Sequence, residues 1–176
     1  RIAALTATQV PLLTTDQIVA LSTLQASAIT GAQVANLTTA QLAKMETADF
    51  AALSTGAIAA LTGTQVSNLT TDEIRALTTT QIAKITAFSI KDLNAGQLQA
   101  FTSDQLPSLT TEQIKSLSAT LVSSFTTDQI PALSTADVGT LDYLQIKALT
   151  TAQISKLTTD QVKALATNVI QYIETE

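Results

Sequence analysis

Apolar residues recur along this chain with a period of eight. From Ala3 the sequence divides into consecutive octads without insertion or deletion, and twenty-one octads cover residues 3–170, with partial repeats at both ends. The consensus is x-A-L-T-T-x-Q-I, and positions 3 and 8 are apolar in every octad. Because no linker or composition shift interrupts the pattern, we predict that residues 1–176 form a single tandem-repeat array.

Two polar positions of the octad predict where a helix begins. Position 4 is Thr or Ser in seventeen of the twenty-one octads, and position 7 is Gln or Glu in fifteen. This S/T-x-x-E/Q spacing is the capping box, in which two orphan N–H groups at a helix start are bonded reciprocally. Positions 3 and 8 flank the box as a hydrophobic staple. The pattern predicts helix caps at Thr14, Thr70, Thr110, Thr126, Thr150 and Thr158.

Neither a long helix nor a plain strand fits this period. In a continuous helix the apolar stripe would rotate by roughly 80° from one octad to the next. Pro11, Pro107 and Pro131 all fall at position 1, where each removes an N–H that a longer helix needs. We therefore predict an all-α solenoid of very short helices, one per octad, with two octads per coil as the simplest arrangement. A β-solenoid with bends inside each octad is the alternative, because positions 3 and 8 have opposite parity.

Composition removes most kinds of chemistry. The chain has no His and no Cys, so it lacks the usual bases, thiolates and metal ligands, and its many hydroxyls lack an activating base. Asp16, Asp72, Asp104 and Asp128 are single in separate octads, and Asp137 and Asp142 occupy different octad positions. A calcium loop instead gathers several oxygen ligands within about twelve residues. We expect no enzyme activity, and no catalytic, cofactor-binding or metal-binding residues.

Charge and hydropathy restrict the partners. The net charge is −5 and no basic cluster is present, so a nucleic-acid partner is not expected. The chain also lacks a run of about eighteen apolar residues, so we expect no membrane insertion. Most departures from the consensus are mild and are attributed to repeat drift, although Leu121 and Val169 should weaken their caps. The departures are Glu46, Ala57, Ser89, Leu121, Ala166 and Val169.

The run Leu149–Val162, LTTAQISKLTTDQV, shows the repeat most clearly. It resembles the L-T-T-x-Q-I octapeptide arrays of large bacterial secreted or cell-surface proteins of the adhesin-like kind. The resemblance implies an extracellular or cell-surface location and a role as a stalk, spacer or assembly segment. Since the chain starts without Met, we expect it to be a piece of a longer protein.

Three functional hypotheses follow. The first is a structural segment: a rod, a spacer or a self-assembling filament element whose partner is a second copy of itself. The second is a scaffold that binds a protein or peptide through outward apolar residues, with Leu24, Phe88 and Leu144 at position 6 and Tyr143 at position 5. The third is ice binding by position-5 Thr, which is present in thirteen of the twenty-one octads.

Overall fold

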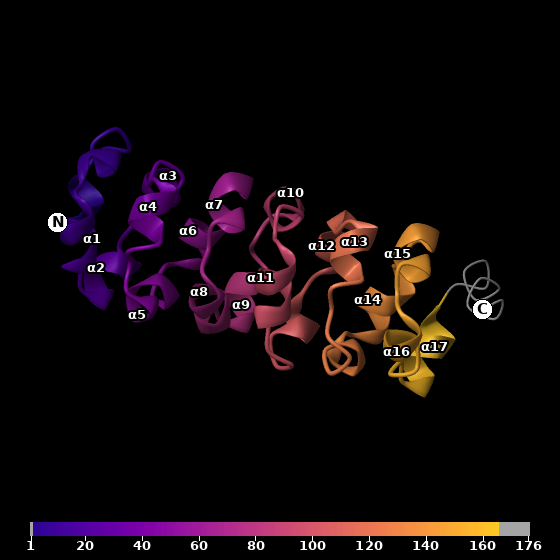
Figure 1. The fold of residues 1–176 in the computed structure, drawn as a ribbon. Coiled ribbons are helices and arrows are strands. Elements are labelled where there is room, and N and C mark those ends of the chain that lie inside the picture. Colours follow the sequence, from indigo (N-terminus) through magenta and orange to yellow (C-terminus); the bar gives the residue numbers. More distant parts are fainter. Residues whose placement is uncertain (1, 166–176) are drawn as a thin grey trace.

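The chain forms an elongated rod of short helices (Figure 1). The computed structural model describes residues 2–165; the end of the twenty-first octad, with the departures at Ala166 and Val169, lies outside the described residues. The first and last α-helices, α1 (Thr15–Val19) and α17 (Thr159–Ala164), lie at opposite ends of the rod. Residues 2–165 contain helices and turns but no strand. The all-α solenoid is therefore confirmed, and the β-solenoid alternative is wrong.

The helices follow the octads closely. Each α-helix starts at position 5, directly after the position-4 cap, and spans four to six residues. Short 3-10 helices occur at η1 (Ile2–Ala4), η2 (Val10–Leu12), η3 (Leu106–Ser108) and η4 (Ile130–Ala132). Between α1 and α17 lie α2 Thr23–Ser27, α3 Gly31–Val34, α4 Thr39–Leu42, α5 Thr47–Ala51, α6 Thr55–Ala59, α7 Gly63–Ser67, α8 Thr71–Ala76, α9 Thr79–Ile82, α10 Ala87–Ile90, α11 Ala95–Ala100, α12 Thr111–Ser116, α13 Ala119–Val122, α14 Thr135–Gly139, α15 Tyr143–Lys147 and α16 Thr151–Ile154.

The predicted caps are present. Thr14, Thr70, Thr110, Thr150 and Thr158 each begin an α-helix with a complete capping box. Thr126 makes the same two reciprocal bonds with Gln129, at 2.9 and 3.2 Å, although no α-helix follows it. Each box satisfies two backbone N–H groups at the start of a segment that is too short to be stable alone.

Proline explains the three described octads without an α-helix. They are the octads that end just before Pro11, Pro107 and Pro131, and each ends in a 3-10 helix with the proline in its centre. An α-helix in these octads would need the N–H that proline lacks, and the ring disfavours α-conformation in the preceding residue. At these three places the short helix is thus of the 3-10 type.

Each turn of the solenoid contains between three and three and a half octads. Helices three octads apart pack together, as in the pairs α3–α6, α5–α8, α8–α11 and α14–α17. Side-chain hydrogen bonds also join residues 28 apart, which is three and a half octads of eight. The expected coil of two octads is therefore wrong. A physical reason is that two octads supply only four large apolar side chains, too few to fill a core between such short helices.

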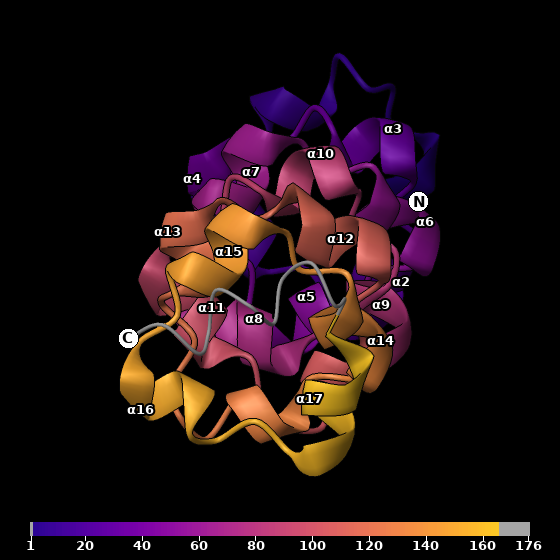
Figure 2. The ribbon, with the colours of Figure 1, turned by 90° about the vertical axis from the view of Figure 1, so that its right-hand side faces the viewer.

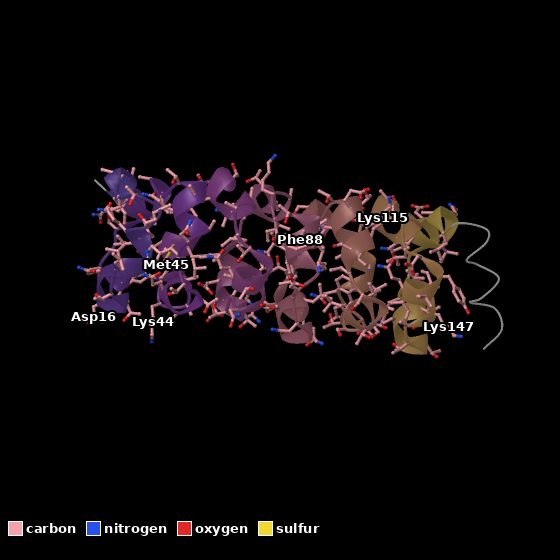
Figure 3. All side chains as sticks on the ribbon, turned by 90° about the horizontal axis from the view of Figure 1, so that it is seen from above. Asp16, Lys44, Met45, Phe88, Lys115 and Lys147 are labelled. Carbon is pink, nitrogen blue, oxygen red and sulfur yellow. The ribbon has the colours of Figure 1, made fainter. Side chains whose placement is uncertain are left out.

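Positions 3 and 8 form one continuous core along the rod. Ile74 and Ile82 at position 8 are fully buried, and Leu77 and Ile85 at position 3 are nearly so. Viewed down the axis of the rod, the helices surround its interior (Figure 2), which the side chains of positions 3 and 8 fill. Figure 3 shows Lys44 pointing away from the rod, next to Met45, which is buried. Stability thus comes from contacts between successive turns, as in other solenoids.

Candidate functional site

The most regular polar feature of the rod is the side chain at position 7. In α12, Gln113 is only 2% exposed. Its Oε1 accepts from the backbone N–H of Thr110 at 2.7 Å, which completes the capping box. Its Nε2 donates to the backbone carbonyls of Ile82 and Ile85 in the preceding turn, at 2.8 and 2.6 Å. One side chain therefore joins a helix start in one turn to a helix end in another.

We call this set of bonds the glutamine ladder. In each of its members, Nε2 donates to the carbonyl 28 residues earlier over 2.6 to 2.9 Å, and to a second carbonyl 30 or 31 residues earlier. The members are Gln33, Gln41, Gln65, Gln81, Gln97, Gln105, Gln113, Gln129, Gln145, Gln153 and Gln161.

The ladder satisfies carbonyls that the helices themselves leave open. The last carbonyls of a helix have no intrahelical partner. The carbonyl at position 3, such as that of Ile85, receives no backbone N–H and is bonded by the glutamine alone. A buried carbonyl without a donor costs about 1–3 kcal/mol. The ladder therefore both stabilises the contact between turns and fixes their register.

Sequence reasoning assigned position 7 to the capping box and missed the contact between turns. One signal pointed to it. A capping box needs only an acceptor at this position, and Glu and Gln both supply one. Yet position 7 holds Gln in fourteen octads and Glu in one. Such a bias indicates that the second atom of the side chain must donate.

Several octads carry another residue at position 7. The hydroxyl of Ser89 donates to the carbonyl of Leu61 at 2.8 Å and replaces part of the bridge. Ala57 and Leu121 have no donor. Ser118 still accepts from the N–H of Leu121 at 3.1 Å, but Leu121 returns no bond to the cap, so the box there is incomplete, as expected. Beside Leu121 the surface has a hollow of about 220 Å³ lined in part by Leu93 and Ser124.

Within residues 2–165, three further octads have a buried acid in place of glutamine at position 7: Asp49, Glu73 and Asp137. Burial raises the pKa of all three carboxyl groups above their ordinary values. The nearby Glu46 raises the pKa of Asp49 further. Hydrogen bonds from Ser134 oppose the rise in the pKa of Asp137. Each acid therefore holds its proton more firmly than an exposed carboxyl group does.

Several other acidic residues within residues 2–165 act as helix caps or form ion pairs. Asp142 accepts from the N–H of Gln145 at 2.8 Å as a helix cap, whereas Asp137 bonds Ser134, so the structure gives these two acids separate roles. Asp72 forms an exposed ion pair with Arg75 at 3.2 Å on its own helix. Within residues 2–165 no group of three or more acidic side chains is placed to hold a metal ion. In the same range no helix is long and apolar enough to cross a membrane.

The outward apolar residues are separated along the rod. Leu24, Phe88 and Leu144 are exposed by 80%, 73% and 63%, but they lie on α2, α10 and α15. These helices occupy different places along the rod in Figure 1. Tyr143, on α15, is 38% exposed. Lys91 covers the ring of Phe88, with its Nζ 4.9 Å from the ring centre. The three residues therefore do not gather in one patch of the kind that marks a binding surface.

Comparison with known proteins agrees with the repeat. The family model of the ALTTAQ repeat matches two stretches of the chain, residues 42–79 and 130–167. Both stretches contain members of the glutamine ladder: Gln65 in the first, and Gln145, Gln153 and Gln161 in the second. No curated protein matches the chain. The similarity supports a structural repeat array.

Proposed function

We propose that this chain is a rod or spacer segment of a large bacterial extracellular protein, without catalytic activity. The observation that carries the proposal is the glutamine ladder, which joins turn to turn from Gln33 to Gln161. A spacer must hold a defined length, and buried hydrogen bonds between successive turns resist both stretching and slipping. The extracellular location rests on the resemblance to adhesin-like arrays.

The rod proposal is tested by solution scattering on the full chain and on a variant that lacks seven consecutive octads. Seven octads correspond to two turns and to one third of the twenty-one octads. We expect the maximum dimension to fall by about one third while the cross-sectional radius stays the same. A change in cross-section, or a flexible chain without a constant one, would contradict the proposal.

We further propose that the rods assemble end to end. In the first turn Gln17 and Gln25 are exposed, and Leu13 and Leu21 are only partly buried. At the other end Leu157 is partly buried and Val162 is 44% exposed. Both ends therefore expose part of the apolar core positions that pack together between internal turns, and a second copy can cover them.

Sedimentation and electron microscopy across a concentration series test the assembly. We expect linear oligomers that shorten or vanish in Leu13→Lys, which places a charge on the end face. Leu24→Lys is the matched control, because Leu24 is 80% exposed on the side of the rod. Monomers of the unaltered chain at every concentration would refute assembly while leaving the rod proposal intact. Protease treatment of intact source cells tests the location: protection of the array from protease would count against it.

A further inference from the structure

Glu73 on α8 replaces glutamine in the ladder by an acid of the same shape. Its Oε2 takes the role of the glutamine Oε1, because it accepts from the N–H and the hydroxyl of Thr70 at 2.6 and 2.9 Å. Its Oε1 then occupies the place of the amide nitrogen. The side chain is 2% exposed, and Oε1 is buried without a hydrogen-bond partner.

The register of the ladder identifies what Oε1 faces. The neighbouring members Gln65 and Gln81 donate to carbonyls 28 residues earlier, in Leu37 and Leu53. The same step from Glu73 leads to Met45, between α4 and α5, and a step of 31 residues leads to Leu42, the last residue of α4. Helix α8 packs on α5. The carbonyl of Met45 receives no hydrogen bond from the backbone or from any described side chain. Oε1 and the carbonyl of Met45 are thus two acceptors without a donor, whereas the carbonyl of Leu42 already accepts from the backbone N–H of Met45 at 2.9 Å.

We propose that Glu73 carries a proton on Oε1 and that this O–H donates a hydrogen bond to the carbonyl of Met45, so that this joint between turns is closed by proton binding. A protonated carboxyl group has one donor and one acceptor oxygen, as the glutamine side chain has a donor and an acceptor end. The protonated acid can therefore make the ladder's bond to the carbonyl 28 residues earlier, which is the carbonyl without a backbone donor. The carboxylate supplies only acceptors and leaves the joint without its bridge.

The electrostatic surroundings agree with this geometry. Burial is the main cause that raises the pKa of Glu73 above 4.5, the ordinary value, and the two bonds from Thr70 oppose the rise. The charged groups near the joint on the α5 side are Lys44, Glu46 and Asp49, and α11, the other neighbour of α8, carries none. On α8 itself Asp72 and Arg75 are exposed and pair with each other. No charged group contributes to the rise in the pKa of Glu73.

The direction of the pH effect follows. Because the pKa is raised in the folded chain, the stabilisation by the proton is complete below the ordinary value of 4.5 and is lost as pH rises through the higher folded value. The contact between α5 and α8 is therefore more stable in acid and becomes less stable as pH rises. This behaviour is independent of whether the rod serves as a spacer or assembles.

Carboxyl-carbon NMR of the labelled full chain tests the proposal directly. The signal that disappears in Glu73→Gln is expected to titrate above 4.5 in the unaltered protein. Glu73→Gln should also melt about 2–4 °C higher than the unaltered chain at pH 8 and equally at pH 4. Glu112→Gln is the matched control, since Glu112 is 74% exposed, and it should show no such pH-dependent gain.

Two results would overturn the proposal. One is a titration of Glu73 at or below the ordinary value. The other is a titration that moves to higher pH when sodium, potassium or calcium chloride is exchanged for a bulky organic cation at constant ionic strength. Because a bound cation favours the carboxylate and lowers its pKa, that outcome would assign these oxygens to a metal ion in place of a proton. An unchanged titration in all four salts supports the proton.

Discussion

Two stretches of the rod join their turns by different means. In α11, η3 and α12, three consecutive octads carry Gln97, Gln105 and Gln113, and each amide donates to carbonyls of the preceding turn. In α5 and α6, two consecutive octads carry Asp49 and Ala57 at position 7, and neither side chain makes such a bond. Both stretches nevertheless keep the same core, since Phe50 and Ile58 are fully buried.

At α6, where Ala57 lacks a donor, small residues pack closely against the neighbouring turn. A Cβ atom on Gly31 in α3 would lie 3.0 Å from the carbonyl oxygen of Gly56 and 3.1 Å from the Cβ of Ala60. The backbones of α3 and α6 thus approach too closely for a side chain between them. The comparison teaches that adjacent turns can be held by a polar bridge or by direct backbone contact, and that the second requires glycine.

Removing a member of the ladder should have the largest effect. Gln113→Leu leaves the buried carbonyl of Ile85 without a donor, so we expect the free energy of unfolding to fall by about 2–3 kcal/mol. Gln17→Leu is the control, because Gln17 forms the same capping box but is exposed and bonds no other turn. It should cost about 0.5–1 kcal/mol. Urea unfolding measures the free energy of unfolding of both variants. Equal losses in the two would show that the bridge between turns adds no stability.

Filling a close backbone contact should cost somewhat less. A Cβ on Gly139 would lie 2.8 Å from the carbonyl oxygen of Ala164, so Gly139→Ala must push α14 and α17 apart, at a cost of about 1–3 kcal/mol. A Cβ on Gly56 meets nothing nearer than the Ser54 Oγ at 3.9 Å. Gly56→Ala should stabilise the chain by about 0.5–1 kcal/mol through helix propensity. Thermal unfolding measures both, and a shift of the same sign in the two variants would contradict the close contact.

The buried acid of the second stretch should give a smaller, pH-dependent effect. Burial and Glu46 raise the pKa of Asp49, so the folded chain loses stability as pH rises from acid through that raised value. Asp49→Asn should remove this part of the decline and stabilise the chain at neutral pH by at most about 1 kcal/mol. The measurement is the denaturation midpoint against pH, with the exposed Asp16→Asn as control. Identical pH profiles of the unaltered chain and Asp49→Asn would contradict the expectation.

The outer face should matter least in both stretches. Leu24→Thr and Phe88→Thr replace side chains that are 80% and 73% exposed, so each should change the free energy of unfolding by no more than about 0.5 kcal/mol. Calorimetry of the two variants measures it. A loss above 1 kcal/mol at either position would indicate that the residue packs against part of the protein.

The repeat sequence predicts local structure well because its signals are local. The cap, the staple and the apolar positions all lie within eight residues, and they predict the helix that begins at Thr15 or at Thr111. Pro107 and Pro131 mark where the α-helix fails, although the 3-10 helices that replace it were not predicted.

The arrangement of the turns was not predictable in the same way. A period of eight describes each octad but not the angle between successive octads, which depends on how short helices pack around a shared core. The bond from Gln113 to Ile85 spans 28 residues, a distance that no motif of the octad contains. For the same reason the unpartnered oxygen of Glu73 emerges only when one turn lies on another.

The step of 28 residues also bears on how such a chain can change its length. Every octad with Gln carries its own donor, and every octad offers the same carbonyls, so a donor finds an equivalent acceptor whichever octad lies below it. Gain or loss of one whole octad by slippage during DNA replication therefore re-pairs the ladder without leaving a faulty turn. A change that is not a multiple of eight residues shifts each glutamine away from the carbonyls. Selection on the gene can thus adjust the length of the rod in steps of eight residues, each roughly two-sevenths of a turn.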